Sequence, residues 1–242
     1  MTEESLQPAL LLLPNLLGEQ RHLEPFLPNS VAKAVGTIDG LIAESAGGAR
    51  RYLSLFATKK KNHEMPVALY RGEREEEFLD FLLEPIQKGE RWGLVSDAGL
   101  PCIADPGAFL VHRARQKGIV VRAFIGPSSL LLALMLSGLP GQKFAFHGYL
   151  DQHSSTRTKQ IRRLVEVAQQ EVMTQIVMEA PHRNGLFLDV LLSQLPDPFW
   201  LTVAWDLTLP TQGVVTQKIS SWKKASRPQI EKKPALFLFA AP

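Results

Sequence analysis

The sequence is poor in cysteine and has no long apolar run. Cys102 is the single cysteine among 242 residues, which excludes an internal disulfide and a metal centre built from several cysteines. The longest apolar runs, 9–13 and 130–136, are far shorter than the roughly 20 residues that span a bilayer. Residues 1–4 lack the positive charge of a secretory signal. We therefore expect a cytosolic protein without a membrane span.

Several common ligand-binding motifs are absent as well. The chain contains neither a Walker A sequence nor a G-x-G-x-x-G fingerprint, so the sequence disfavours kinases and dehydrogenases. Its six histidines show no metal-ligand spacing such as His-x-x-x-His, and no metal is expected.

The composition is that of a folded protein with a slight excess of positive charge. Hydrophobic residues make up 45% and charged residues 21%, and the net charge is +3. This basicity is compatible with a polyanionic partner but does not identify one. Small basic groups could contact RNA phosphates, although solvated surfaces explain them equally well. The candidates for substrate binding are Arg50, Arg51, Lys59, Lys60 and Lys61.

Short β-like runs alternate with helical stretches through the first half, which is typical of an α/β fold with a mostly parallel sheet. The pattern predicts strands at 9–13, 40–43, 67–70, 93–95 and 119–124, with helices at 31–36, 49–56, 75–88, 108–117 and 130–136. The last helix is apolar all round, so we expect it to be buried. The pattern breaks at 138–141. We therefore predict two domains, 1–141 and 142–242.

The second half also reads as α/β. We expect strands at 144–150, 175–178, 201–205 and 235–239, and helices around 161–168 and 186–194.

Two loops each follow a predicted strand and precede a predicted helix, where open α/β sheets bind ligands. The loop 97–107 is rich in glycine and small residues, so its backbone can approach a nucleoside closely. The loop 126–129 offers hydroxyls and free amides that suit a carboxylate. The simpler alternatives are a turn-rich connection with Asp105 as a helix cap, and ordinary capping by Ser128 or Ser129.

Taken together, the ordered motifs resemble those of the tetrapyrrole methylase superfamily, and within it the branch of small-subunit rRNA ribose 2′-O-methyltransferases. The segments that carry this resemblance are 95–101, 104–107, 126–129, 137–140, 147–150, 179–183 and 206–208.

The resemblance implies a homodimer of two-domain subunits, with a mostly parallel sheet in the first domain and a mixed sheet in the second. It places S-adenosylmethionine in the interdomain cleft and implies no metal. The residues implied to bind this methyl donor are Leu13, Pro14, Asp97, Gly99, Leu100, Ile103, Ala104, Ser128, Ser129, Met178, Ala204, Pro234 and Ala235.

The acceptor side departs from the family pattern at 13–18 and 44–51, the regions that face the substrate in the family. Glu44 and Glu179 are the candidate catalytic residues, because a hydroxyl acceptor needs a base to take its proton. For Glu179 a salt bridge is the alternative, and for Cys102 a packed thiol is more plausible than a nucleophile.

Methyl transfer to rRNA ribose is the leading functional hypothesis. A methyltransferase of a tetrapyrrole or another small molecule is the second, and a non-catalytic protein that senses S-adenosylmethionine is the third. The altered acceptor-side segments keep the third hypothesis open.

Overall fold

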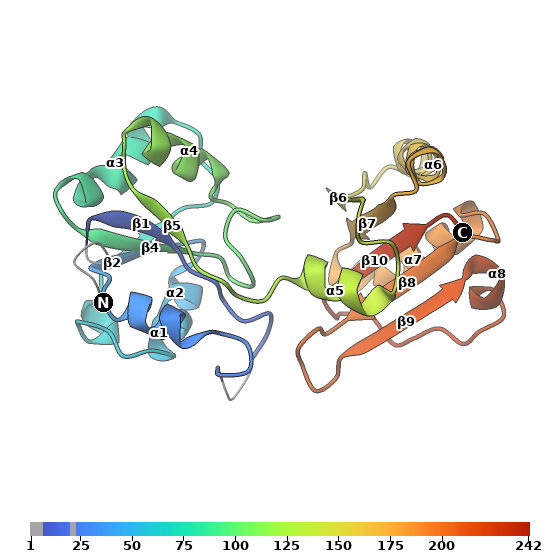
Figure 1. Cartoon of the computed structure of the whole chain (residues 1–242), viewed down its shortest axis with the longest axis horizontal. Helices are drawn as coiled ribbons and strands as arrows, with labels where there is room; N and C mark the ends of the chain where they lie inside the picture. The colour runs from blue at the N-terminus through green and yellow to red at the C-terminus, as the bar shows by residue number, and fades with distance from the viewer. Residues whose placement is uncertain (1–6, 20–22) are drawn as a thin grey trace. The chain divides into compact units, whose positions relative to one another are not determined.

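The chain folds as two compact units, each built around its own five-stranded sheet (Figure 1). The structure is a computed structural model that describes residues 7–19 and 23–242. The units comprise residues 1–128 and 129–242. This division falls earlier than the predicted boundary after Gly141, because helix α5 (Ser129–Ser137) packs against three strands of the second sheet.

The first sheet is entirely parallel, with strand order β3-β2-β4-β1-β5, which confirms the predicted fold class. Its strands are β1 (Ala9–Leu12), β2 (Gly40–Ala43), β3 (Val67–Leu69), β4 (Arg91–Val95) and β5 (Val121–Ala123). Four helices cover this sheet: α1 (Asn29–Val35), α2 (Ala46–Ser54), α3 (Glu76–Gln87) and α4 (Ala108–Gln116).

Alternate residues of the strands supply two separate cores, one on each face of the sheet. Leu11 and Leu13 pack with α1 and α2, whereas Leu10 packs with α3 and α4. Figure 1 shows these two helix layers with the sheet between them. Burial on both faces explains why the strands read as continuous apolar runs rather than alternating ones.

Helix α2 begins earlier than predicted, whereas helix α3 lies within its predicted range 75–88. Helix α2 begins before the glycine pair 47–48 rather than after it, because Ser45 Oγ accepts a hydrogen bond from Gly48 N (2.9 Å) and caps the helix. Helix α3 continues two residues past Pro85 and ends at Gln87, so this proline lies in its last turn.

The second sheet is mixed, with order β6-β7-β10-β8-β9. Only β6 and β7 pair in parallel, and the remaining pairs are antiparallel. Its strands are β6 (Phe144–Tyr149), β7 (Thr174–Met178), β8 (Trp200–Trp205), β9 (Gly213–Lys218) and β10 (Ala235–Ala240). Strand β9 has no counterpart among the sequence predictions.

The second core lies between the sheet and helices α6 (Ser154–Glu171), α7 (Asn184–Gln194) and α8 (Ile219–Trp222). Helix α5 covers the opposite face, where Thr216 Oγ1 donates to Ser137 O (3.0 Å). The prediction that α5 is buried all round is wrong, because Leu131, Met135 and Leu136 are exposed.

Two short 3₁₀ turns, η2 (Asn62–Glu64) and η3 (Pro181–Arg183), complete the elements used below. Within residues 7–19 and 23–242, no helix is long and apolar enough to cross a membrane. The expectation drawn from residues 1–4 lies outside the described residues.

Candidate functional site

The first sheet has its switch point between β1 and β4. These strands are neighbours in the sheet. The chain continues from β1 to β2, toward one edge of the sheet, but from β4 to β5, toward the opposite edge. In open α/β sheets, ligands bind beyond the carboxyl ends of such a strand pair. Leu13 and Pro14 follow β1 here, and both are buried. Asp97 follows β4 two residues after its end and is exposed.

Asn15 joins the two loops that leave this switch point. Its Nδ2 atom donates to Ser96 O and to Asp97 O, both at 3.0 Å, and its backbone N–H donates to Gly99 O (2.7 Å). Gly99 N–H in turn donates to Leu16 O (3.2 Å). Sequence analysis did not select Asn15. The sequence feature that could have indicated Asn15 is its polar amide, which closely follows a buried strand.

Asp97 lies over the first turn of α2. Its backbone N–H donates to Glu44 Oε1 (3.1 Å), and its Oδ1 atom accepts a hydrogen bond from Ser45 Oγ (3.2 Å). A Cβ atom added to Gly48 would overlap Asp97 Oδ1. The structure therefore brings the predicted residues Glu44 and Asp97 into direct contact, beside the capping Ser45 that sequence analysis did not assign to the site.

Three carboxyl groups share this edge of the sheet. Burial raises the pKa of Glu44, and the charge of Asp97 adds to the shift. Burial together with the charges of Glu44 and Asp97 raises the pKa of Asp105 to about 6, although the Ser96 hydroxyl partly offsets this effect. Asp105 does not cap helix α4 as proposed from the sequence, because that helix begins after Gly107 without a side-chain cap.

The raised pKa of Asp105 predicts a pH-dependent loss of stability. Its folded pKa of about 6 exceeds its ordinary value of 3.8, so the stabilisation is complete below about pH 4 and is lost as the pH rises through about 6. After allowance for partial exposure, we expect Asp105→Asn to raise the free energy of unfolding at pH 7 by about 1–2 kcal/mol. Urea unfolding at pH 4, 5, 6 and 7 measures this. Parallel curves for the variant and the wild type would contradict it.

The loop 99–107 follows a strained backbone path. Gly99 has φ 70°, and two non-glycine residues, Cys102 and Ala104, have φ of 71° and 65°. A Cβ atom on Gly107 would overlap Cys102 Sγ. Burial, helped by the charge of Asp105, raises the pKa of the Cys102 thiol to about 11, which supports a packed thiol rather than a nucleophile. Ile103 is 49% exposed and leaves an apolar surface on the loop.

The second loop lies against the first strand's end. A Cβ atom on Gly126 would overlap Pro14 Cβ, so only glycine allows this close approach. Ser128 is half-buried and ends the first unit, whereas Ser129 is the first residue of α5. Leu100 is half-buried between Gly99 and the buried Pro101.

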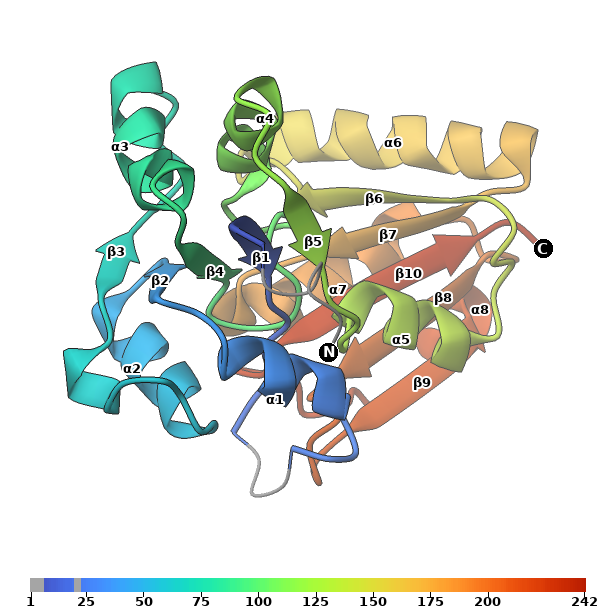
Figure 2. The ribbon, with the colours of Figure 1, turned by 60° about the vertical axis from the view of Figure 1, so that its left-hand side comes forward.

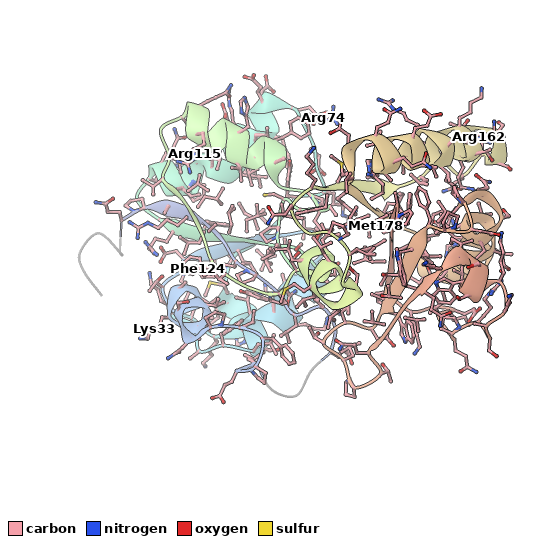
Figure 3. All side chains as sticks on the ribbon, turned by 45° about the vertical axis from the view of Figure 1, so that its right-hand side comes forward. Lys33, Arg74, Arg115, Phe124, Arg162 and Met178 are labelled. Carbon is pink, nitrogen blue, oxygen red and sulfur yellow. The ribbon has the colours of Figure 1, made fainter. Side chains whose placement is uncertain are left out.

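Four of the predicted donor-site residues lie together at one end of the second sheet. Leu236 of β10 pairs with Met178 of β7 on one side and with Ala204 of β8 on the other. Ala235 is the first residue of β10, and Pro234 precedes it. Met178 and Ala204 therefore lie in one row across three strands with Leu236 between them, and Ala235 and Pro234 precede Leu236 at the start of β10. Met178 is labelled in Figure 3.

Glu179 follows Met178 and holds a structural ion pair. The side chain is buried, and its Oε1 atom accepts from Arg183 Nε (3.1 Å), from a second nitrogen of that guanidinium (2.5 Å) and from Ala180 N (2.7 Å). This geometry confirms the salt-bridge alternative for Glu179. His182, between them in sequence, is exposed.

The basic candidates do not form one group. Arg50 donates to Asn62 O and Met65 O and so holds the η2 turn against α2. Lys59 pairs with Asp39 (2.7 Å), which immediately precedes β2 at the amino end of the sheet, opposite the Glu44 edge. Lys60 and Lys61 are exposed next to it. Arg51 is also exposed, and its guanidinium reaches back beside Gly47 in the first turn of α2.

Among the residues 7–19 and 23–242, no group of three or more His, Cys, Asp and Glu side chains could hold a metal ion.

Solved methyltransferases share this fold. The methyltransferase CobJ superposes with a TM-score of 0.64 over 97% of this chain and 99% of its own, at 14% identity. Diphthine synthase gives 0.65 over 96% of this chain and 89% of its own, at 15% identity. A uroporphyrin-III C-methyltransferase from Thermus thermophilus, complexed with S-adenyl homocysteine, gives 0.55 at 18% identity over 96% and 97%. The chain therefore has the tetrapyrrole methylase fold, as its motifs indicated.

Similarity in sequence narrows the class. Proteins named ribosomal RNA small subunit methyltransferase I match the chain at 32% identity in Thermotoga maritima, over 79% of this chain and 83% of that protein, and at 34% in Pasteurella multocida, over 77% and 63%. The match in Xylella fastidiosa is 35% identical over 61% of this chain and 50% of that protein. No family model matches the chain. The chain belongs to the family of ribosomal RNA small subunit methyltransferase I. It spans only 50% and 63% of the Xylella and Pasteurella relatives.

Proposed function

We propose that this protein transfers a methyl group from S-adenosylmethionine to a ribose 2′-hydroxyl of small-subunit ribosomal RNA. Membership of the family named for this activity supports the proposal, and so does the pair of loops at the switch point. The single observation that carries it is the pair of hydrogen bonds from Asn15 Nδ2 to Ser96 O and Asp97 O, because they fix the two loops at the place where an α/β sheet binds its ligand.

The residues at this edge fit the donor in charge and in shape. S-adenosylmethionine supplies an activated methyl group on a positively charged sulfonium, and it also carries an amine. The carboxyl groups of Glu44, Asp97 and Asp105 provide a negative potential that attracts such a ligand. The exposed Ile103 offers apolar contact to the adenine ring of the donor.

The proposed donor contacts are the residues that the family resemblance implies. In the first unit they are Leu13, Pro14, Asp97, Gly99, Leu100, Ile103, Ala104 and Ser128. In the second unit they are Ser129, Met178, Ala204, Pro234 and Ala235.

Glu44 is the proposed base for the acceptor hydroxyl. Its raised pKa makes its carboxylate a stronger base than an ordinary glutamate, and it lies beside Asp97 at the ligand edge. Glu179 is not proposed for this role, because Arg183 and Ala180 N already engage its Oε1 atom. Arg51, exposed beside the same turn of α2, is the proposed contact for an RNA phosphate.

We also propose that the protein is a cytosolic homodimer. The exposed apolar side chains of α5, Leu131, Met135 and Leu136, support pairing with a second copy. A ribosomal acceptor supports the cytosolic location.

Calorimetric titration with S-adenosylmethionine and with its demethylated product tests the donor site. We expect micromolar binding for the wild type and at least a tenfold loss for Asp97→Ala, because the negative potential and the contact to Ser45 are both removed. Asp197→Ala is the matched control, since Asp197 is an exposed aspartate paired with Lys223 in the second unit. Equal affinities for both variants and the wild type would place the donor elsewhere.

Transfer of a radiolabelled methyl group separates the three functional hypotheses. Incorporation into small ribosomal subunits supports the rRNA acceptor, whereas incorporation only into a small-molecule extract supports the second hypothesis. Tight donor binding without transfer to either supports a sensor.

A further inference from the structure

Helix α6 presents a row of cations on its outer face. Ile161, Leu164 and Ala168 are buried in the core, so they define the inward side of this 18-residue helix. Lys159 and the pair Arg162 and Arg163 lie on the opposite side and are exposed. Figure 2 shows α6 running along the edge of the second sheet, and Figure 3 labels Arg162 on it. We call Lys159, Arg162 and Arg163 the α6 basic face.

No carboxylate in the described part of the chain forms an ion pair with the α6 basic face. Other cations of the second unit do have partners, as in the pair Lys143 with Glu171 and the pair Lys233 with Asp206. Three cations without a carboxylate partner therefore lie on the exposed side of this helix, against a single carboxylate, Glu166, on the same side.

The arrangement contributes little to the stability of the helix, because repulsion among the three cations opposes the attraction of the arginines to Glu166, three and four residues after them. Lys159 lies three and four residues before the two arginines, which places like charges next to one another on the surface. An external anion would relieve this repulsion.

An open hollow lies beside the start of α6. Tyr149, Leu150, Asp151, Gln152, His153 and Gln160 line it, and its volume is about 450 Å³. Tyr149 is 57% exposed, so much of this aromatic residue is accessible to a nucleic-acid base. Amide and imidazole groups around the ring supply hydrogen-bond donors and acceptors.

We infer that the α6 basic face, together with the hollow at Tyr149, is an RNA-binding surface that holds phosphates along the helix and stacks a base on the tyrosine. Phosphates match the three unpaired cations, and the aromatic ring matches an unpaired base. A membrane surface fits less well, because the apolar stripe of α6 is packed in the core and is not free to enter lipid. The inference rests on the proposed function only in that the bound RNA would include the methyl acceptor.

Salt-dependent binding of RNA to the full chain tests this surface. The probes are small-subunit ribosomal RNA and a single-stranded oligouridine, with affinity measured by fluorescence anisotropy at several salt concentrations. Each lost phosphate contact lowers the slope of log affinity against log salt by about 0.7 for single strands. We expect the triple variant Lys159→Gln, Arg162→Gln, Arg163→Gln to reduce the slope by about 2, and Tyr149→Ala to weaken binding without changing the slope.

The lysine run 59–61, replaced by glutamine, is the matched control of equal charge. Lys59 pairs with Asp39 at the amino end of the first sheet, and we expect this variant to keep the wild-type slope. The proposed RNA-binding surface is refuted if the α6 variant keeps the wild-type salt slope. It is also refuted if the slope falls equally in the control variant of the lysine run 59–61. Binding to phosphatidylserine vesicles in place of RNA, if it depends on α6, refutes it as well.

Donor titration of the same proteins distinguishes this inference from the proposed function. Wild-type protein that binds S-adenosylmethionine but no RNA overturns the surface and leaves the methyltransferase standing. RNA binding that depends on α6, in a protein that binds no donor, supports the surface and overturns the proposed activity.

Discussion

Gly48→Ala is expected to destabilise the protein and weaken donor binding, whereas Gly47→Ala, one residue earlier in helix α2, is expected to stabilise it. Alanine normally favours a helix over glycine by about 0.5–1 kcal/mol. The added Cβ atom at Gly47 meets nothing closer than the Arg51 guanidinium at 3.7 Å, so the full gain is expected there.

At Gly48 the same atom would overlap Asp97 Oδ1 and lie 2.8 Å from Ser45 Oγ. Relief requires the Asp97 carboxylate and the Ser45 hydroxyl to turn away, which breaks their mutual hydrogen bond and the cap on Gly48 N, and we expect a cost of about 1–3 kcal/mol. The cost exceeds the helix gain, so the sign reverses between neighbouring positions. Asp97 would also leave its place over α2, and we expect donor affinity to fall by at least tenfold.

Urea unfolding and calorimetric donor titration of both variants measure these effects. Equal stabilisation by the two alanines would show that Asp97 does not press against the helix. If both Gly47→Ala and Gly48→Ala lost donor affinity, the loss would be due to a general disturbance of α2 and not to the displacement of Asp97.

The sequence predicts the architecture of the first unit well because its signals are local. Leu10, Leu11 and Leu13 belong to a continuous apolar run, and such a run indicates a strand covered on both faces. The order β3-β2-β4-β1-β5 depends instead on which strands pair over long distances, and no residue pattern records it. Strand β9 escaped prediction because Gly213–Lys218 is half polar and is only partly buried at the sheet edge.

Part of the candidate site was predictable because it, too, is marked by local sequence signals. Asp97 stands in a glycine-rich loop after a strand, which is a local signal. Its contact with Glu44 and Ser45 joins positions more than fifty residues apart, and it exists only because β2 and β4 are neighbours. Lys59 shows the reverse case. Its charge made it a candidate, but folding places it beside Asp39 at the other end of the sheet.

Asn15→Ala is expected to lower both stability and donor affinity, because Asn15 is the residue that ties the two switch-point loops together. Its side chain donates to Ser96 O and Asp97 O, and its Oδ1 atom accepts from Leu16 N (2.8 Å). Each such bond contributes about 1 kcal/mol net, so we expect a loss of roughly 2–3 kcal/mol in the free energy of unfolding.

The replacement Asn15→Asp separates the role of the bonds from that of side-chain shape. Aspartate has nearly the same volume but cannot donate when ionised, and it would bring a negative charge against two carbonyl oxygens. We therefore expect Asn15→Asp to be at least as damaging as Asn15→Ala. Asn29→Ala, at the exposed first position of α1, is the control and should leave both properties unchanged.

A role of Asn15 in positioning the loop can be tested separately from its role in stability. The test is donor titration of the folded variants under conditions below their unfolding transition. If Asn15 only contributed stability, the folded fraction of Asn15→Ala would bind the donor with wild-type affinity. If it fixes the Ser96–Gly99 backbone in the binding geometry, the folded variant binds at least tenfold more weakly. The second outcome is expected, because the bonds of Asn15 end on the carbonyl oxygens of the loop on which the proposed donor site is built.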